Sequence, residues 1–203
     1  MASRNSGRKR KRLIRALYFF SLGSLLLGIG ILTATFWPIF VNEAKYAALQ
    51  VKPVAAEIEP VDKDFGIVIP KIGANSKVIA NVDPYNSKVY QRALTQGVAH
   101  AAGTILPGEI GNSFLFSHSS VNFYEASRYN SVFYLLNKLE EGDLIYIYVK
   151  GEKLEFTVTD KGLYNSSAVN FLKSTGQGST LTLMTCWPPG TTFKRLIITA
   201  RLN

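Results

Sequence analysis

A long uncharged segment near the amino terminus is the feature that most restricts how this chain can fold. No charged side chain occurs between residues 16 and 42, and the segment is rich in leucine, isoleucine, phenylalanine and glycine. As an α-helix rising about 1.5 Å per residue, it can cross the roughly 30 Å hydrocarbon core of a bilayer. A buried helix of a soluble domain rarely runs so long without a polar face, and the apolar stretch of a cleaved signal peptide normally has only about 7–15 residues. We therefore predict an uncleaved transmembrane signal anchor at residues 16–42.

Basic residues are concentrated on one side of this segment. The chain of 203 residues has a net charge of +9, and seven of its 23 lysines and arginines lie in residues 1–15, before the first acidic residue, Glu43. Because positive flanks stay in the cytoplasm, residues 1–15 are predicted to form a cytoplasmic tail and everything after residue 42 to be extracellular. Without the tail, 16 basic residues face 14 acidic ones, so no nucleic-acid partner is expected. The prediction is a single-pass protein of the cell membrane, with membrane lipid as one partner.

Residues 43–64 have the composition of a linker. They contain two prolines, several alanines and charges of both signs, but no apolar stripe. Residues 44–50 could extend the anchor helix briefly. Fully extended, the segment could reach on the order of 70 Å, enough to hold a domain clear of the headgroups. We expect a plain tether; the alternative is a lid in which Tyr46 or Phe65 plugs an apolar groove.

The remaining residues, 65–203, are predicted to form a mostly β domain. Short runs rich in β-branched and aromatic residues recur between turns that contain glycine or proline. The predicted strands lie at residues 66–69, 113–117, 144–149, 154–159, 180–185 and 196–202, and a short helix is predicted at 132–139. Because long helices do not alternate with these strands, an antiparallel barrel or sandwich is favoured, and we predict a closed barrel.

Three side chains capable of covalent chemistry lie at predicted strand ends. Cys186 is the only cysteine, so it cannot form an intramolecular disulfide. His118 follows one predicted strand, and Arg195 begins the last one. If strands 180–185 and 195–202 pair as a hairpin, Cys186 and Arg195 face each other across its open end. Each residue also has an ordinary interpretation, as a buried cysteine, a solvated histidine and a surface arginine.

The sequence resembles the sortases, membrane-anchored cysteine transpeptidases of bacterial surfaces, over nearly the whole of residues 65–203. The matching segments occur in family order at residues 67–72, 93–100, 107–112, 114–118, 139–143 and 181–186, followed by Arg195. The T-L-x-T-C signature ending at Cys186 and the order histidine, cysteine, arginine are jointly specific. The resemblance implies a closed eight-stranded β-barrel with short helices. It also implies that Cys186 is the nucleophile, His118 the acid/base and Arg195 the stabiliser of the oxyanion.

The resemblance further implies a substrate and a reaction. A sorting signal of the LPxTG type would be cleaved after its threonine through a thioester on Cys186. The acyl group would then pass to an amine on the cell wall or on another protein, and water would compete to give slow peptide hydrolysis. Calcium can be required in this family, but no acidic cluster here has convincing ligand spacing. A zinc site built on several thiolates is excluded by the single cysteine, so no metal or other cofactor is expected.

Several features bear on the branch of the family. Ser119 follows the histidine where many relatives carry arginine, and no second hydrophobic segment occurs at the carboxyl end, which speaks against the pilus-polymerising class. Residues 83–85 lie too late in the chain to be the lid motif of that class and are predicted to form a turn. The segments G-V-A-H-A at 97–101 and C-W-P-P-G-T-T at 186–192 look closest to housekeeping-like or class D/E branches. His100, which lies in the first of them, is predicted to be structural.

Two other functions are considered. A papain-like protease is disfavoured, because in that class the cysteine precedes the histidine and lies on a helix, whereas here a predicted strand precedes the cysteine. A catalytically inactive scaffold or adhesion module on a membrane stalk is the alternative from a different class. It predicts an unreactive Cys186 and no acyl-enzyme.

Overall fold

The computed structural model describes residues 3–51, 58–119, 132–166 and 178–203. The chain divides into two compact units, Met1–Val41 and Asn42–Asn203. The helices are α1 (Ser3–Val51), α2 (Ser87–Leu94) and the short 3-10 helices η1 (Pro70–Ile72) and η2 (Leu136–Lys138). The strands are β1 (Phe65–Ile69), β2 (Ala74–Val82), β3 (Val98–Ala101), β4 (Gly111–Phe116), β5 (Leu144–Val149), β6 (Glu152–Asn165), β7 (Ser179–Trp187) and β8 (Lys194–Leu202).

Helix α1 contains the predicted membrane segment. Among the described residues, its part from Arg10 to Trp37 is the one stretch of helix long and apolar enough to cross a membrane, by length and composition. The helix continues to Val51, so residues 43–51 of the predicted linker are helical. Residues 52–57 of that linker lie outside the described part of the chain. The division into tail, anchor, linker and catalytic domain stays a prediction.

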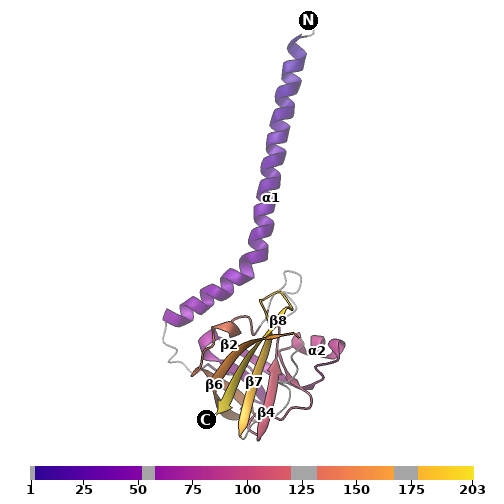
Figure 1. Ribbon diagram of the computed structural model, residues 1–203. Helices are drawn as coiled ribbons and strands as arrows, with labels where there is room; N and C mark the ends of the chain where they lie inside the picture. The colour runs from indigo at the N-terminus through magenta and orange to yellow at the C-terminus, as the bar shows by residue number, and fades with distance from the viewer. Residues whose placement is uncertain (1–2, 52–57, 120–131, 167–177) are drawn as a thin grey trace. The chain divides into compact units, whose positions relative to one another are not determined.

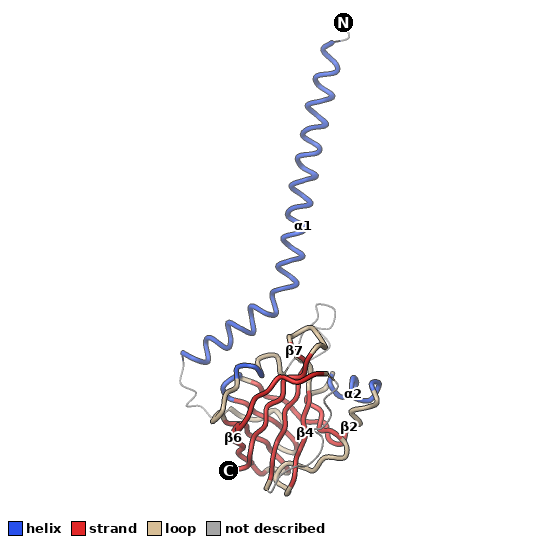
Figure 2. The backbone as a smooth tube through the Cα atoms, in the orientation of Figure 1, coloured by secondary structure: helices blue, strands red, loops and turns tan. Residues whose placement is uncertain are grey.

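Eight strands close into a barrel in the order β1-β2-β3-β4-β7-β8-β6-β5 (Figures 1 and 2). Most neighbouring strands are antiparallel, but β2 pairs with β3 and β4 with β7 in parallel. The prediction of a mostly β, closed eight-stranded barrel with few helices is confirmed. The parallel pairing of β4 and β7 places the carboxyl ends of these two strands at the same end of the barrel.

The barrel has an apolar core inside and a second apolar cluster outside. Because side chains alternate along a strand, Leu115 of β4 and Leu183 of β7 point inward, where both are completely buried. Phe114 and Phe116 of β4 point to the other face, where helix α2 covers them. Full burial of a leucine or phenylalanine stabilises the fold by about 1.5–3 kcal/mol, so both clusters fix the strand faces. The outer cluster is important for the site because it lies on the face that carries Cys186.

The structure contains four elements that the sequence did not predict: η1, β2, β3 and α2. In the first part of strand β2, buried and half-buried positions alternate, but the strand carries several polar side chains. Its sequence therefore shows no clear alternation of apolar and polar residues. Helix α2 has only eight residues, and its start is fixed by the side chain of Asn86, which accepts a hydrogen bond from the N–H of Val89. The predicted turn at residues 83–85 is present, with the Asp83 carboxylate accepting from the N–H of Tyr85 at 2.9 Å.

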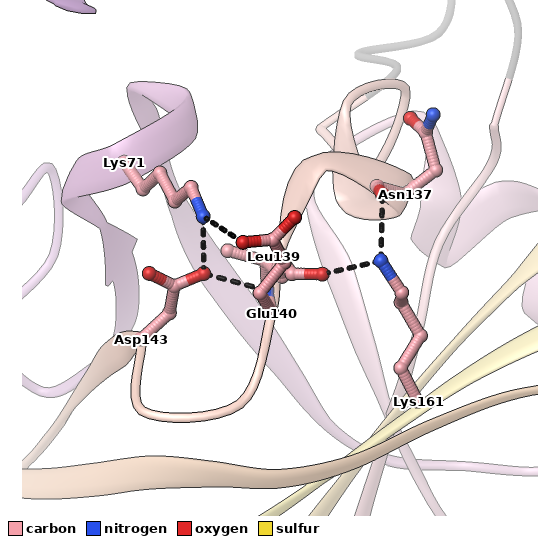
Figure 3. Close-up of polar contacts among 6 residues, drawn as sticks. All are labelled: Lys71, Asn137, Leu139, Glu140, Asp143 and Lys161. Atoms are coloured by element: carbon pink, nitrogen blue, oxygen red, sulfur yellow. Dashed lines mark hydrogen bonds and ion pairs between the residues drawn. The ribbon is translucent and has the colours of Figure 1, made fainter.

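The short helix predicted at residues 132–139 is present only in part, as η2. The structure has turns followed by the three-residue η2, because the buried side chains Phe133, Leu136 and Leu139 recur every third residue, which is the period of a 3-10 helix. The carbonyls of Asn137 and Leu139 accept hydrogen bonds from Nζ of Lys161 at 3.1 and 2.7 Å, as Figure 3 shows. A side chain from β6 therefore takes carbonyls that a longer helix would have paired with its own backbone.

A second lysine fixes the connection between η2 and β5. Nζ of Lys71, in η1, lies 2.8 Å from the carboxylate of Asp143 and 3.7 Å from that of Glu140 (Figure 3). Burial lowers the pKa of Lys71, but the hydrogen bond and the charge of Asp143 outweigh this effect and raise the pKa overall. The same carboxylate also accepts a hydrogen bond from the N–H of Glu140 at 2.6 Å. Lys71 thus ties this connection to the end of β1.

Candidate active site

Cys186 lies at the open end of the β7–β8 hairpin. It is directly paired with Arg195 in the antiparallel register, so the predicted hairpin is confirmed. Nη1 of Arg195 lies 3.4 Å from Sγ of Cys186, close enough for a guanidinium N–H to donate a hydrogen bond to the sulfur. Both residues are half-buried. The thiol is therefore accessible at one end of the barrel, with a fixed positive charge beside it.

His118 follows β4, the strand that runs parallel to β7. The register pairs Phe116 with Met184, and the N–H of Ser117 donates to the carbonyl of Met184 at 3.2 Å. His118 and Cys186 each follow two residues after this last pair of the register. His118 is half-buried, as the cysteine is. The structure thus brings the three predicted residues to the same end of the barrel.

Thr185 ties these two strands together beside the candidate site. Its side chain is buried, and its hydroxyl donates to the carbonyl of Ser117 at 2.9 Å. Thr185 directly precedes Cys186, and Ser117 directly precedes His118. This threonine belongs to the T-L-x-T-C signature, but the sequence alone gave it no role. The structure shows that it joins the two strand ends from which the thiol and the imidazole extend.

The outer apolar cluster lies beside the thiol. Side chains two residues apart on a strand share a face, so Cys186 continues the face of Met184, which packs against this cluster. Phe116 lies in the cluster, and the ring of Tyr90 from α2 packs edge-on against it, with centroids 6.2 Å apart. Cys186 therefore lies at the end of the strand face that helix α2 covers.

The guanidinium of Arg195 is held by the turn that precedes it. Nη1 donates to the carbonyls of Thr192 and Lys194, each at 3.3 Å. The turn is closed by Thr191, whose N–H and hydroxyl both donate to the carbonyl of Pro188, at 3.0 and 2.8 Å. The P-P-G-T-T segment signals a turn in the sequence, but it does not reveal these hydrogen bonds. Sequence reasoning therefore missed Thr191 and Thr192.

The second histidine, His100, lies in β3 and is 3% exposed. Its Nε2 lies 2.9 Å from the carbonyl of Ile105 and 3.0 Å from the hydroxyl of Thr104, while Nδ1 accepts from the N–H of Asn81 at 3.3 Å. These contacts fit a neutral ring with its proton on Nε2. Burial lowers the pKa of His100, and the hydrogen bond with Ile105 opposes this only in part. These surroundings agree with the predicted structural role.

The site residues supply a thiol, an imidazole and a guanidinium. These groups can act as nucleophile, proton carrier and anchor for a negative charge, which together suit the making and breaking of an acyl–sulfur bond. In the part of the chain that the structure describes, no group of three or more His, Cys, Asp and Glu side chains could hold a metal ion.

Known proteins show the same fold and a family match. Residues 67–203 match the family model of the sortase domain. Among solved structures, the chain is similar to a lid mutant of sortase A from Corynebacterium diphtheriae, with 26% identity, 76% of this chain and 75% of that chain covered, and a TM-score of 0.58. No curated protein matches the sequence.

Two further structures share the fold. One is sortase C-1 from Actinomyces oris, with 23% identity, 80% of this chain and 98% of that chain covered, and a TM-score of 0.58. The other is a sortase D5 transpeptidase from Clostridium perfringens, with 24% identity, 79% and 88% covered, and a TM-score of 0.55. Since these neighbours carry the labels A, C and D, the predicted class D/E branch stays a prediction. The family model covers more than half of the sequence, and this chain therefore belongs to the sortase family.

Proposed function

We propose that this protein is a cysteine transpeptidase that cleaves an LPxTG-like sorting signal after its threonine and transfers the acyl group to an amine. Membership of the sortase family supports a transpeptidase. One observation carries the assignment of the residues: Nη1 of Arg195 lies 3.4 Å from Sγ of Cys186, at the end of the strand whose parallel neighbour leads into His118.

In the first step the thiolate of Cys186 attacks the carbonyl carbon of the substrate threonine. A cysteine thiolate is a strong nucleophile even when it is a minor species at neutral pH. The attack places negative charge on the carbonyl oxygen, and the guanidinium of Arg195 stabilises that charge. Loss of one such donor typically lowers the rate by about 10²–10³, so Arg195 is expected to be essential for efficient acylation.

His118 carries the proton in both halves of the reaction. Protonated His118 gives its proton to the departing amine as the carbon–nitrogen bond breaks, which leaves a thioester on Cys186. It then takes a proton from the incoming amine, which attacks the thioester carbonyl and releases Cys186 as its thiolate. Water in place of the amine gives slow hydrolysis of the peptide.

Family membership and helix α1 support the proposed substrate class and location. A sortase C from Clostridium perfringens has been solved with the C-terminal cell wall sorting motif, which supports a peptide of this kind as the substrate here. The apolar part of α1 supports a membrane anchor. In the proposed arrangement, residues 1–15 are cytoplasmic, the barrel is extracellular, and the acceptor amine belongs to the cell wall or to another surface protein.

The test is to trap the thioester. Full-length protein in detergent micelles is incubated with LPxTG and LAxTG peptides, and its intact mass is recorded. We expect a mass increase equal to the peptide truncated after threonine, lost on adding hydroxylamine and absent in Cys186→Ala. If no adduct forms, the alkylation rate of Cys186 distinguishes the two possible causes. An inert thiol supports the inactive scaffold. Rapid alkylation that depends on His118 supports an active site that recognises a different peptide.

A further inference from the structure

We infer that Thr191 is a positioning residue for Arg195: its hydroxyl closes the β7–β8 turn, and the closed turn holds the guanidinium beside Cys186. The inference rests on the proposed function, because turnover depends on Thr191 only if Arg195 stabilises the oxyanion. The hydrogen bonds of residues 188–195 carry it.

Two donors of Thr191 converge on a single acceptor. Its N–H and its hydroxyl lie 3.0 and 2.8 Å from the carbonyl oxygen of Pro188. A carbonyl oxygen has two lone pairs, so this pair of bonds uses the full capacity of the acceptor. The first half of the connection between Trp187 and Lys194, which are paired across the hairpin, is thereby fixed.

Two later carbonyls of the same turn hold the guanidinium of Arg195. The oxygen of Thr192 accepts a hydrogen bond from Nη1 of Arg195 at 3.3 Å, as does the oxygen of Lys194. Because Thr192 follows Thr191 directly, a change in the orientation of Thr191 moves this acceptor. The hydroxyl of Thr191 is therefore linked to the guanidinium through one residue of backbone.

All of these bonds engage one corner of the guanidinium. The same Nη1 atom also contacts Sγ of Cys186 at 3.4 Å, whereas Nη2 and Nε of Arg195 make no hydrogen bond within the described residues. The guanidinium is planar and its donors are rigidly connected, so fixing Nη1 orients the other nitrogens. We assign Nη2 and Nε to the developing oxyanion of the substrate, and the turn to the task of aiming them.

The kinetic test uses Thr191→Val in the full-length protein. Valine removes the hydroxyl bond but keeps the shape and the backbone N–H. Since a small displacement of a catalytic group can cost up to 10²-fold in rate, we expect kcat for peptide cleavage to fall by about tenfold with KM changed less than about twofold. Thr191→Ser restores the hydroxyl and should restore the rate. Thr157→Val is the matched control, because it removes a hydroxyl that bonds to Asn203, away from the turn.

A double-mutant cycle shows whether the effect passes through Arg195. In an Arg195→Lys background, Thr191→Val should cause little further loss, since lysine lacks the planar fork that the turn aims. An equal loss in both backgrounds would overturn the inference. If Arg195→Lys itself keeps the full rate, the proposed role of Arg195 fails instead, and that outcome is separate from any result for Thr191 alone.

A second readout needs no substrate. Phenylglyoxal modifies arginine side chains, and peptide mapping gives the rate at Arg195 relative to the exposed Arg201 as an internal reference. If the turn holds the guanidinium, Thr191→Val should raise this ratio by about threefold, because the side chain becomes free to reorient. An unchanged ratio would overturn the inference, whether or not any peptide is cleaved.

Discussion

Nη1 of Arg195 lies 3.4 Å from Sγ of Cys186, and the antiparallel register of β7 and β8 pairs the two residues directly. A hairpin thus sets the distance between the proposed nucleophile and the positive charge that would stabilise the oxyanion. Because the two residues are only nine positions apart in the sequence, the contact is local and forms whenever the hairpin forms. Its removal should therefore affect chemistry far more than folding.

Replacement of Arg195 by alanine should separate these two effects. We expect the acylation rate to fall by about 10²–10³ while the melting temperature changes little, because the oxyanion loses its donor but the hairpin keeps its backbone bonds. Single-turnover formation of the thioester, followed by intact mass, measures the rate. Acylation within twofold of the wild-type rate would contradict the proposed role.

Thr185→Val should reduce both stability and rate. The buried hydroxyl donates to the carbonyl of Ser117, and its loss should cost about 1–2 kcal/mol of unfolding free energy. The spacing between His118 and Cys186 should also loosen. Thr180→Val is the control, since Thr180 bonds to Gly111 and Asn112 at the opposite end of the same two strands. We expect the control to lower the melting temperature but to keep the rate; an equal loss of rate in both variants would refute the positional effect.

Tyr46, from the carboxyl-terminal part of α1, packs against the main core within the unit Asn42–Asn203. Nζ of Lys138 lies 5.2 Å from the centre of its ring and 3.4 Å from the carboxylate of Glu43. Tyr46→Ala should lower the unfolding free energy by about 1–3 kcal/mol, whereas Glu43→Gln should cost less than about 1 kcal/mol because the ion pair is partly exposed.

Urea unfolding of the full-length protein measures both effects. Tyr85→Ala is the matched control, because the side chain of Tyr85 is 76% exposed. If Tyr46→Ala destabilises the protein no more than this control does, the segment is a plain tether after all.

His100 predicts a dependence of stability on pH. Burial lowers its pKa in the folded protein, so the unfolded chain binds the proton more readily. This contribution to stability is complete above the unfolded pKa of about 6.5 and is lost as the pH falls from there towards the folded pKa. The slope reaches at most about 1.4 kcal/mol per pH unit for one proton. Unfolding at pH 7.5 and 5.5 should show a smaller difference in His100→Gln than in the wild type, and equal differences would disprove the assignment.

Ser113 is completely buried, and its hydroxyl has no hydrogen-bond partner among the described residues. Removing a buried, unsatisfied polar group should stabilise the fold, so Ser113→Ala should raise the unfolding free energy by about 1 kcal/mol. Ser76→Ala serves as the comparison, because the buried hydroxyl of Ser76 donates to the carbonyl of Lys77 at 3.0 Å. That variant should be destabilised, and a loss of stability in both would show that the Ser113 hydroxyl is satisfied in the folded protein.

The barrel could be predicted because its core strands are recognisable in the sequence. Strands such as β5 and β7 are short, β-branched or aromatic, and bounded by turn residues. The pairing of Cys186 with Arg195 was also accessible, since a hairpin needs only local information. By contrast, β2 was missed because polar residues interrupt the apolar alternation that marks a half-buried strand. Helix α2 was missed because its eight residues are too few to show a clear helical periodicity.

That His118 and Cys186 lie at the same end of the barrel could be obtained only from the family resemblance. The strands that bring them together meet across 68 residues, and no spacing rule specifies such a pairing in advance. Thr191 was missed for another reason, because it acts through backbone carbonyls that any residue type could supply. Tyr46 was named only within the alternative of a lid, because its segment has the composition of a linker, and the structure packs it against the main core.

The parallel contact between β4 and β7 also has a consequence for the newly made protein. Such a distant pairing forms late in folding, because the long loop between the strands must close, at a cost in entropy, before the strands make any contact. A slip of one residue would turn the histidine to the opposite face of the sheet, away from the sulfur. An incompletely folded chain therefore carries a thiol without its acid/base partner. Under the proposed mechanism, it can cleave peptides only after the barrel has closed in the correct register.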